Sequence, residues 1–162
     1  MLGLVATAGD VNPDINGRPS PVIVRLYDLK NVAAFDSADF FSLWDRDQAT
    51  LGQEMIARDE YPMAPNEQRK FEREPTDTAP LPYIGVVAAF RDIEHTRWRA
   101  TFEVPRQKTT ELLVTLSAGG ISIKAASVGL NPANLPNLPN APNLPAKPAA
   151  PALPHVDIPA RP

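Results

Sequence analysis

Residues 83–90 read YIGVVAAF and residues 97–104 read RWRATFEV, and these two stretches decide the fold class. The first stretch is apolar almost throughout, which predicts a central strand covered on both faces. In the second, Trp98, Ala100, Phe102 and Val104 alternate with charged or polar residues, which predicts a strand with one buried face. The pair therefore predicts a protein built mainly from β-strands.

Other stretches with strand character lie on both sides of this pair. They are residues 2–8, 22–29, 69–74, 111–117 and 121–125, together with the end of residues 51–63. The charges of residues 69–74 are typical of an edge strand, and Gly119 and Gly120 predict a hairpin. For residues 51–63 we expect a short helix and then a short strand ending at Met63. About eight strands at this spacing predict an all-β fold, a β-sandwich of two sheets.

Residues 35–52, FDSADFFSLWDRDQATLG, interrupt the strand pattern after the second predicted strand. Asp36 or Ser37 is expected to cap the start of a helix there, and Gly52 to end it. The segment carries a cluster of large apolar side chains: Phe40, Phe41, Leu43 and Trp44. Since these side chains need an apolar surface to cover, we expect a small helical insertion packed on a sheet.

The composition changes after Ala126, because ten of the nineteen prolines follow it. We therefore expect a β-sandwich domain at residues 1–126 and a proline-rich tail at residues 127–162. From Pro136 to Pro154 a proline occurs at every third residue, which is the period of a polyproline II helix. The pattern is compatible with a stiff, solvated spacer, and also with a docked strap or a ligand for an aromatic groove. We expect the tail to lie on its own domain or on a neighbouring molecule.

Charge and cysteine content exclude several classes of protein. The formal net charge is −3, which argues against nucleic-acid binding. The chain has no cysteine, so it has no disulfide, thiol catalysis or thiolate metal site. It contains no apolar run long enough for a membrane helix. Residues 1–10 lack a basic leader, so we expect either a cytosolic protein or the mature part of an exported one.

Candidate catalytic groups are sparse, and we predict that the chain is not an enzyme and needs no cofactor. Asp92, Glu94 and His95 could form a metal site, but three neighbouring residues of one loop are more typical of a solvated hairpin. Neither a nucleophile elbow nor a zinc-binding helix motif occurs. A β-sandwich of this kind is expected to bind something through its loops.

A long turn-forming stretch, NPDINGRPSP, occupies residues 12–21 between the first two predicted strands. Asn16 and Gly17 favour a turn, and Pro13, Pro19 and Pro21 restrict the backbone and remove hydrogen-bond donors. Taken alone, the stretch predicts a long, stiff connection between two strands.

Several motifs of residues 2–126 resemble one family, the outer-membrane lipoproteins of the type VI secretion system called TssJ, SciN or VasD. The resemblance rests on N-P-D-x-N-G-R-P-S-P, on V-R-L-Y-x-L and F-x-x-A-D-F-F-x-L after it, and on Y-I-G-V-V-A-A-F-R-D. It implies a transthyretin-like β-sandwich with a small helical addition. It also implies a structural, anchoring role in the membrane complex of the secretion system.

The resemblance further implies a partner and a location. Family members bind the periplasmic C-terminal region of TssM, the large inner-membrane component, through the loop between the first two strands. The corresponding residues are Asn12, Pro13, Asp14, Ile15, Asn16, Gly17, Arg18, Pro19 and Ser20, with Ile15 and Arg18 expected as the main contacts. Members are acylated on an N-terminal cysteine at the periplasmic face of the outer membrane. Because these 162 residues include no cysteine, we expect them to correspond to the mature soluble part without the lipidated residue.

One alternative comes from a different class of function. A periplasmic β-sandwich could bind a small ligand or a cell-wall glycan, with Trp44, Trp98 or Tyr83 exposed in a groove.

Overall fold

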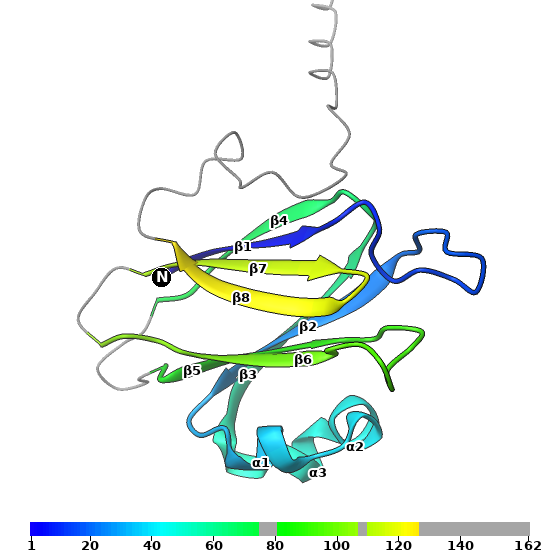
Figure 1. Cartoon of the computed structure of the whole chain (residues 1–162). Coiled ribbons are helices and arrows are strands. Elements are labelled where there is room, and N and C mark those ends of the chain that lie inside the picture. The colour runs from blue at the N-terminus through cyan, green and yellow to red at the C-terminus, as the bar shows by residue number, and fades with distance from the viewer. Residues whose placement is uncertain (75–80, 107–109, 127–162) are drawn as a thin grey trace, which may run out of the picture.

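The computed structural model describes residues 1–74, 81–106 and 110–126; the tail on which the polyproline II expectation falls lies outside them. Eight strands form two sheets that face each other (Figure 1). The strands are β1 (Leu2–Thr7), β2 (Val22–Leu29), β3 (Met55–Met63), β4 (Gln68–Glu72), β5 (Tyr83–Ala88), β6 (Arg99–Glu103), β7 (Glu111–Ser117) and β8 (Gly120–Ala126). The predicted two-sheet β-sandwich is therefore confirmed.

Each sheet has four strands, in the orders β4-β1-β7-β8 and β3-β2-β5-β6. The predicted hairpin at Gly119 and Gly120 joins β7 to β8, and the predicted edge strand is β4. β1 lies between two neighbours, antiparallel to β4 and parallel to β7. This parallel pairing joins segments far apart in the sequence, and local patterns did not predict it.

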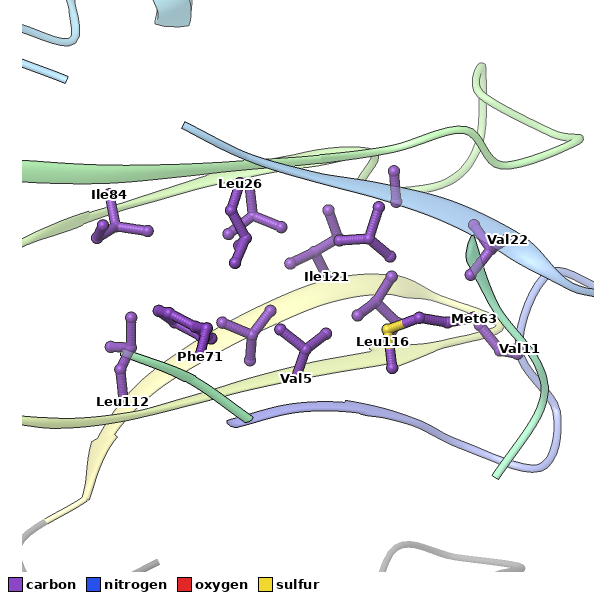
Figure 2. Close-up of a cluster of buried hydrophobic side chains, with 14 of the residues drawn as sticks. Val5, Val11, Val22, Leu26, Met63, Phe71, Ile84, Leu112, Leu116 and Ile121 are labelled. Carbon is purple, nitrogen blue, oxygen red and sulfur yellow. The ribbon is translucent and has the colours of Figure 1, made fainter. Parts of the chain in front are cut away.

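The main hydrophobic core fills the space between the sheets (Figure 2). Alternate residues of each strand point into it, including Val5 of β1, Leu26 of β2 and Ile84 of β5, all fully buried. The predicted inward residues Leu112, Val114 and Leu116 also belong to this core. The two-residue period therefore located the buried face correctly.

The three helices lie on the outer face of the β3-β2-β5-β6 sheet (Figure 1), and a second core fills the space between them and this sheet. Tyr27 and Val87 point into it from the sheet, and Phe35 and Leu43 from the helical segment. β5 therefore contacts an apolar cluster on each face, which explains why YIGVVAAF is almost continuously apolar. The expectation of a doubly covered strand is confirmed.

The helical insertion follows β2 as predicted, but it consists of three short helices rather than one. They are α1 (Ala33–Ser37), α2 (Phe40–Asp45) and α3 (Asp47–Leu51). The expected cap at Asp36 or Ser37 is wrong, because both residues lie inside α1. Asp39 is the residue that caps α2, by accepting a hydrogen bond from the Ser42 backbone N–H at 2.9 Å. The extended backbone of Ala38 separates α1 from α2.

Gly52 ends α3 with a positive φ of 53°, as expected, and a single 3₁₀ turn (Gly52–Glu54) leads into β3. β3 ends at Met63 as predicted but is nine residues long rather than short. No helix in the described ranges is long and apolar enough to span a bilayer.

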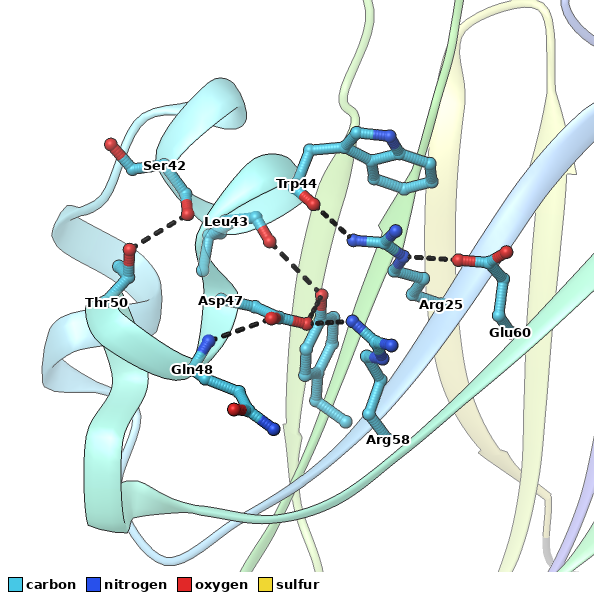
Figure 3. A network of polar contacts seen from close by, with 10 residues as sticks. Arg25, Ser42, Leu43, Trp44, Asp47, Gln48, Thr50, Arg58 and Glu60 are labelled. Carbon is cyan, nitrogen blue, oxygen red and sulfur yellow. Dashed lines mark hydrogen bonds and ion pairs between the residues drawn. The ribbon is translucent and has the colours of Figure 1, made fainter.

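A polar network attaches the helices to the sheet (Figure 3). The Arg25 guanidinium of β2 donates to the Trp44 carbonyl at 2.6 Å, pairs with Glu60 at 2.7 Å and lies 3.8 Å from the centre of the Trp44 ring. Asp47 at the start of α3 is paired with Arg58 of β3. The helical layer is thus held by directional contacts as well as by its apolar face.

Candidate functional site

The connection between β1 and β2 projects beyond one end of the sandwich (Figure 1). The β5–β6 connection and the β7–β8 turn lie at the same end, because β1 and β7 run toward it and β8 runs back. Met1 lies at the opposite end (Figure 1). The fold therefore places the first residue and the predicted binding loop on opposite ends of the same strand.

Asn12 organises the base of the loop. Its side chain is 4% exposed, and its backbone has a positive φ of 48°, a conformation that Asn tolerates better than most residues. The amide nitrogen donates to the Pro21 carbonyl at 2.7 Å, and the amide oxygen accepts from the Arg91 backbone N–H at 2.8 Å. One buried amide thus closes the loop and joins it to the β5–β6 connection.

Asp14 organises the tip. Its carboxylate accepts hydrogen bonds from the backbone N–H groups of Asn16 and Arg18 at 2.8 and 2.9 Å, and it pairs with the Arg18 guanidinium at 3.2 Å. Gly17 has a φ of 76° and donates its N–H to the Asp14 carbonyl at 2.9 Å, which closes the predicted turn. The hydrogen bond from the Arg18 N–H is the main reason why the pKa of Asp14 lies below its usual 3.8.

Exposure separates the nine predicted site residues into two groups. Ile15 is 100% exposed, and Asn16, Gly17, Arg18 and Pro19 are exposed around it. Pro13 and Asp14 are half-buried, and Asn12 and Ser20 are buried at the base. The tip can therefore contact a partner directly, whereas Asn12 and Ser20 hold the loop in place.

An open groove of about 610 Å³ lies beside the loop. Its lining comes from residues 12–15, from Phe90, Arg91, Asp92 and Thr96, and from Ala118. Sequence analysis did not include the β5–β6 connection in the site, because the Asn12 to Arg91 contact joins residues 79 positions apart and leaves no local pattern.

The possible metal site at Asp92, Glu94 and His95 is an exposed turn. His95 Nδ1 lies 2.8 Å from Asp92 Oδ1, and this contact raises the pKa of His95 above its usual 6.5. Within the described residues, no three His, Asp or Glu side chains gather in a way that could hold a metal ion.

The three aromatic residues of the glycan alternative are half-buried and take part in packing. Trp44 stacks on Phe40 with ring centres 5.4 Å apart, and the Trp98 ring meets Phe40 edge-on at 5.3 Å. Arg25 covers the Trp44 ring, as described above. Tyr83 packs against the second core. The contacts of the two tryptophans occupy ring surface that a stacked sugar would need, whereas Tyr83 also lines an open pocket of about 520 Å³ beside Pro82 and Glu103.

Comparisons with known proteins identify the family. A family model described as type VI secretion lipoprotein (VasD, EvfM, TssJ) matches residues 3–119. The crystal structure of the type VI secretion lipoprotein TssJ1 from Pseudomonas aeruginosa is similar, with 38% identity and a TM-score of 0.74, covering 79% of this chain and 96% of that chain.

Two further solved structures share the fold. Lip from Serratia marcescens, a membrane-bound component of the type VI secretion system, is 22% identical with a TM-score of 0.66, covering 76% of this chain and 95% of that chain. A structure named for the C-terminal domain of the type VI secretion protein TssM from EAEC is 25% identical with a TM-score of 0.64, covering 76% and 99%. A search of curated proteins found no significant match. The family model and the identity to TssJ1 together show that the chain belongs to the type VI secretion lipoprotein family.

Proposed function

We propose that the chain is a structural component of the type VI secretion membrane complex that binds the periplasmic C-terminal region of TssM through the β1–β2 loop. It performs no catalysis in this role. The observation that carries the proposal is the tip of the loop, where Ile15 is 100% exposed on a backbone held by Asp14. The similarity to the structure named for the TssM C-terminal domain supports the choice of partner.

The loop has the physical properties of a preorganised docking element. An apolar side chain that is fully exposed has a favourable free energy of burial to gain on binding. Three prolines and the Asp14 hydrogen bonds restrict the tip before binding, so little conformational entropy is lost on docking. Arg18, whose side chain is 75% exposed, supplies a charged group beside the apolar one. This arrangement is a small apolar anchor with a polar rim.

We further propose that the protein is attached to the periplasmic face of the outer membrane by a lipid. The lipid would be carried by a cysteine on the N-terminal side of Leu2, which the 162 residues do not include. The end of the sandwich that holds Met1 then faces the membrane, and the loop points away from it (Figure 1). A single acyl chain gives only marginal membrane binding, so a multiply acylated cysteine is expected. Palmitate labelling and membrane fractionation of the product of the complete gene test the anchor: an unlabelled, soluble product would contradict it.

Loop shortening tests the binding site. Replacement of residues 14–18 by two glycines should abolish binding to the periplasmic domain of TssM from the same organism. The melting temperature should remain nearly unchanged, because Val11, Asn12 and Ser20 at the base are retained. Wild-type affinity in the shortened protein, measured by isothermal titration calorimetry, would show that the loop is not the site.

A pair of point substitutions makes the test sharper. Ile15→Asp should weaken TssM binding at least tenfold, since it places a charge where the apolar contact forms. Phe41→Asp is the matched control, because Phe41 is also a large exposed apolar residue, at 62%, but lies on the helical layer. Equal losses in the two variants would contradict a specific role of Ile15.

A further inference from the structure

β1 is the only element of secondary structure between the first residue and the docking loop. Residues 2–7 form this strand, and the loop tip at Ile15 follows eight residues after Thr7. The covalent path from Met1 to Ile15 therefore has only 14 backbone steps. All other strands, the three helices and the second core are formed by residues that come later in the chain, whereas the main core receives Val5 and Val11 from this path.

Contacts with the rest of the sandwich hold this path at both ends. Near the first residue, the Arg73 N–H donates to the Met1 carbonyl at 3.0 Å and the Leu2 N–H to the Thr110 carbonyl at 3.1 Å. At the loop base, the Ala8 N–H donates to the Leu116 carbonyl at 2.7 Å and the Ser20 N–H to the Val11 carbonyl at 3.1 Å. Between these points β1 is an extended strand with a neighbour on each side, and its residues after Leu2 are buried.

From this topology we infer that tension between the membrane anchor and the partner is carried by residues 1–15 and bypasses the rest of the fold. The inference rests on the proposed function, which places the anchor before Leu2 and the partner at the loop. A force that pulls these two points apart acts along the backbone of β1, which is already extended. It does not pull any later strand away from its neighbours, so the sandwich stays folded while the link between the two membranes is under load.

A different attachment point at the same end of the molecule would have the opposite effect. Ala118, in the β7–β8 turn, lies next to the loop base, where its N–H donates to the Asp10 carboxylate at 3.4 Å. The path from Met1 to Ala118 has 117 steps and includes seven strands. Tension on that path would displace β1 against β7, which are paired over six residues, and would unfold the sandwich once this pairing fails.

Single-molecule pulling with two pairs of attachment points tests the inference. Because the chain has no cysteine, a cysteine added ahead of Met1 combined with either Ile15→Cys or Ala118→Cys defines the points uniquely. The Ile15 pair has 14 steps, which span at most about 50 Å, and β1 already spans about 20 Å of this. The Ala118 pair has 117 steps and should lengthen by several hundred Å, on the order of ten times more.

The recovery of length after the force is released decides the outcome. The protein is pulled through each pair of attachment points at a force above the one that unfolds the sandwich through the Ala118 pair. The force is then lowered. The Ala118 pair should recover only after the delay of refolding, since its sandwich has unfolded. The Ile15 pair should recover at once, since its sandwich has remained folded. A recovery of the Ile15 pair with the same delay as the Ala118 pair would overturn the inference.

A variant at the loop base tests whether the hydrogen bonds of the Asn12 side chain hold the loop in place under force. Asn12→Gly keeps the positive φ but removes the hydrogen bonds to Pro21 and Arg91, so the Ile15 pair should lengthen at a lower force than in the parent. An unchanged force would contradict this part of the inference. These measurements use the protein without TssM, so they succeed or fail independently of the binding tests of the proposed function.

Discussion

Single residues determine two features of this molecule that composition does not show. In the central strand β5, Gly85 leaves room for the Phe35 ring of the helical layer. In the loop, Asp14 collects backbone N–H groups and thereby shapes the tip. The sequence marks both positions only as a glycine in an apolar run and an aspartate among turn residues. Their partners are what give each residue its importance.

Gly85→Ala should destabilise the protein by about 1–3 kcal/mol through overpacking. A Cβ atom at this position would lie 2.8 Å from the Phe35 ring and 2.9 Å from a Leu29 methyl group, so the second core would have to shift. Gly119→Ala is the control, because its Cβ would have no neighbour closer than 3.9 Å. Urea unfolding of both variants measures the difference, and equal stabilities would contradict this account of β5.

The loop tip should lose its order in acid. The pKa of Asp14 is lower in the folded loop than its usual 3.8, so the carboxylate stabilises the tip above pH 3.8 and this contribution is lost as the pH falls through the lower, folded pKa. NMR titration of the Asn16 and Arg18 amide signals should give a midpoint below 3.8. In Asp14→Ala this transition should disappear, and a midpoint above 3.8 in the parent would refute the proposed capping role.

At the scale of elements, the helical layer shows how an insertion becomes part of a β-sandwich. α1, α2 and α3 have five or six residues each, too few to be stable helices alone. Their apolar residues Phe35, Phe40 and Leu43 cover Tyr27, Leu29 and Val87 of the sheet. The apolar cluster of the segment predicted this covering role, but the breaks at Ala38 and Arg46 depend on caps and on the sheet surface below.

Arg25→Lys should loosen the helical layer and lower the free energy of unfolding by about 1–2 kcal/mol. Lysine lacks the planar group that lies over the Trp44 ring while bonding the Trp44 carbonyl and Glu60. Hydrogen exchange should become faster in residues 33–51. The control is Arg69→Lys. The Arg69 side chain is 40% exposed, pairs with Glu67 at the surface and lies 5.2 Å from the centre of the Tyr61 ring, farther than Arg25 from Trp44, so its change should stay below about 0.5 kcal/mol. Similar losses in the two variants would argue against the Arg25 contact.

At the scale of the whole molecule, the two sheets of the described residues pack face to face around one shared core. Every strand pair and both apolar clusters of the described residues lie within residues 1–126. The topology also places Met1 and the β1–β2 loop at opposite ends of the sandwich, because β1 connects these two ends (Figure 1). Both the proposed membrane anchoring and the proposed path of tension depend on this placement of Met1 and the loop.

A chain that ends after Ala126 should fold by itself. The strand partners and core residues described above are all retained, so the amide signals of residues 1–126 should overlay those of the full chain in a two-dimensional NMR spectrum. Loss of signal dispersion in the shortened chain would show that residues 127–162 belong to the folding unit, and would move the proposed domain boundary.

The sequence by itself determined the fold class, the approximate positions of most strands and the family, but not the length of β3. Alternating residues and apolar runs show which face of a strand is buried, and this property is local in the sequence. For this reason residues 22–29 were predicted as a strand with the bounds that the structure has. The loop motif and its turn at Gly17 were also local. Only the tertiary structure decided that β1 is parallel to β7, and that Asn12 joins the loop to Arg91. It also decided that Ile15 is fully exposed while Ser20 is buried. These features depend on contacts between residues far apart in the chain, which side-chain periodicity does not encode.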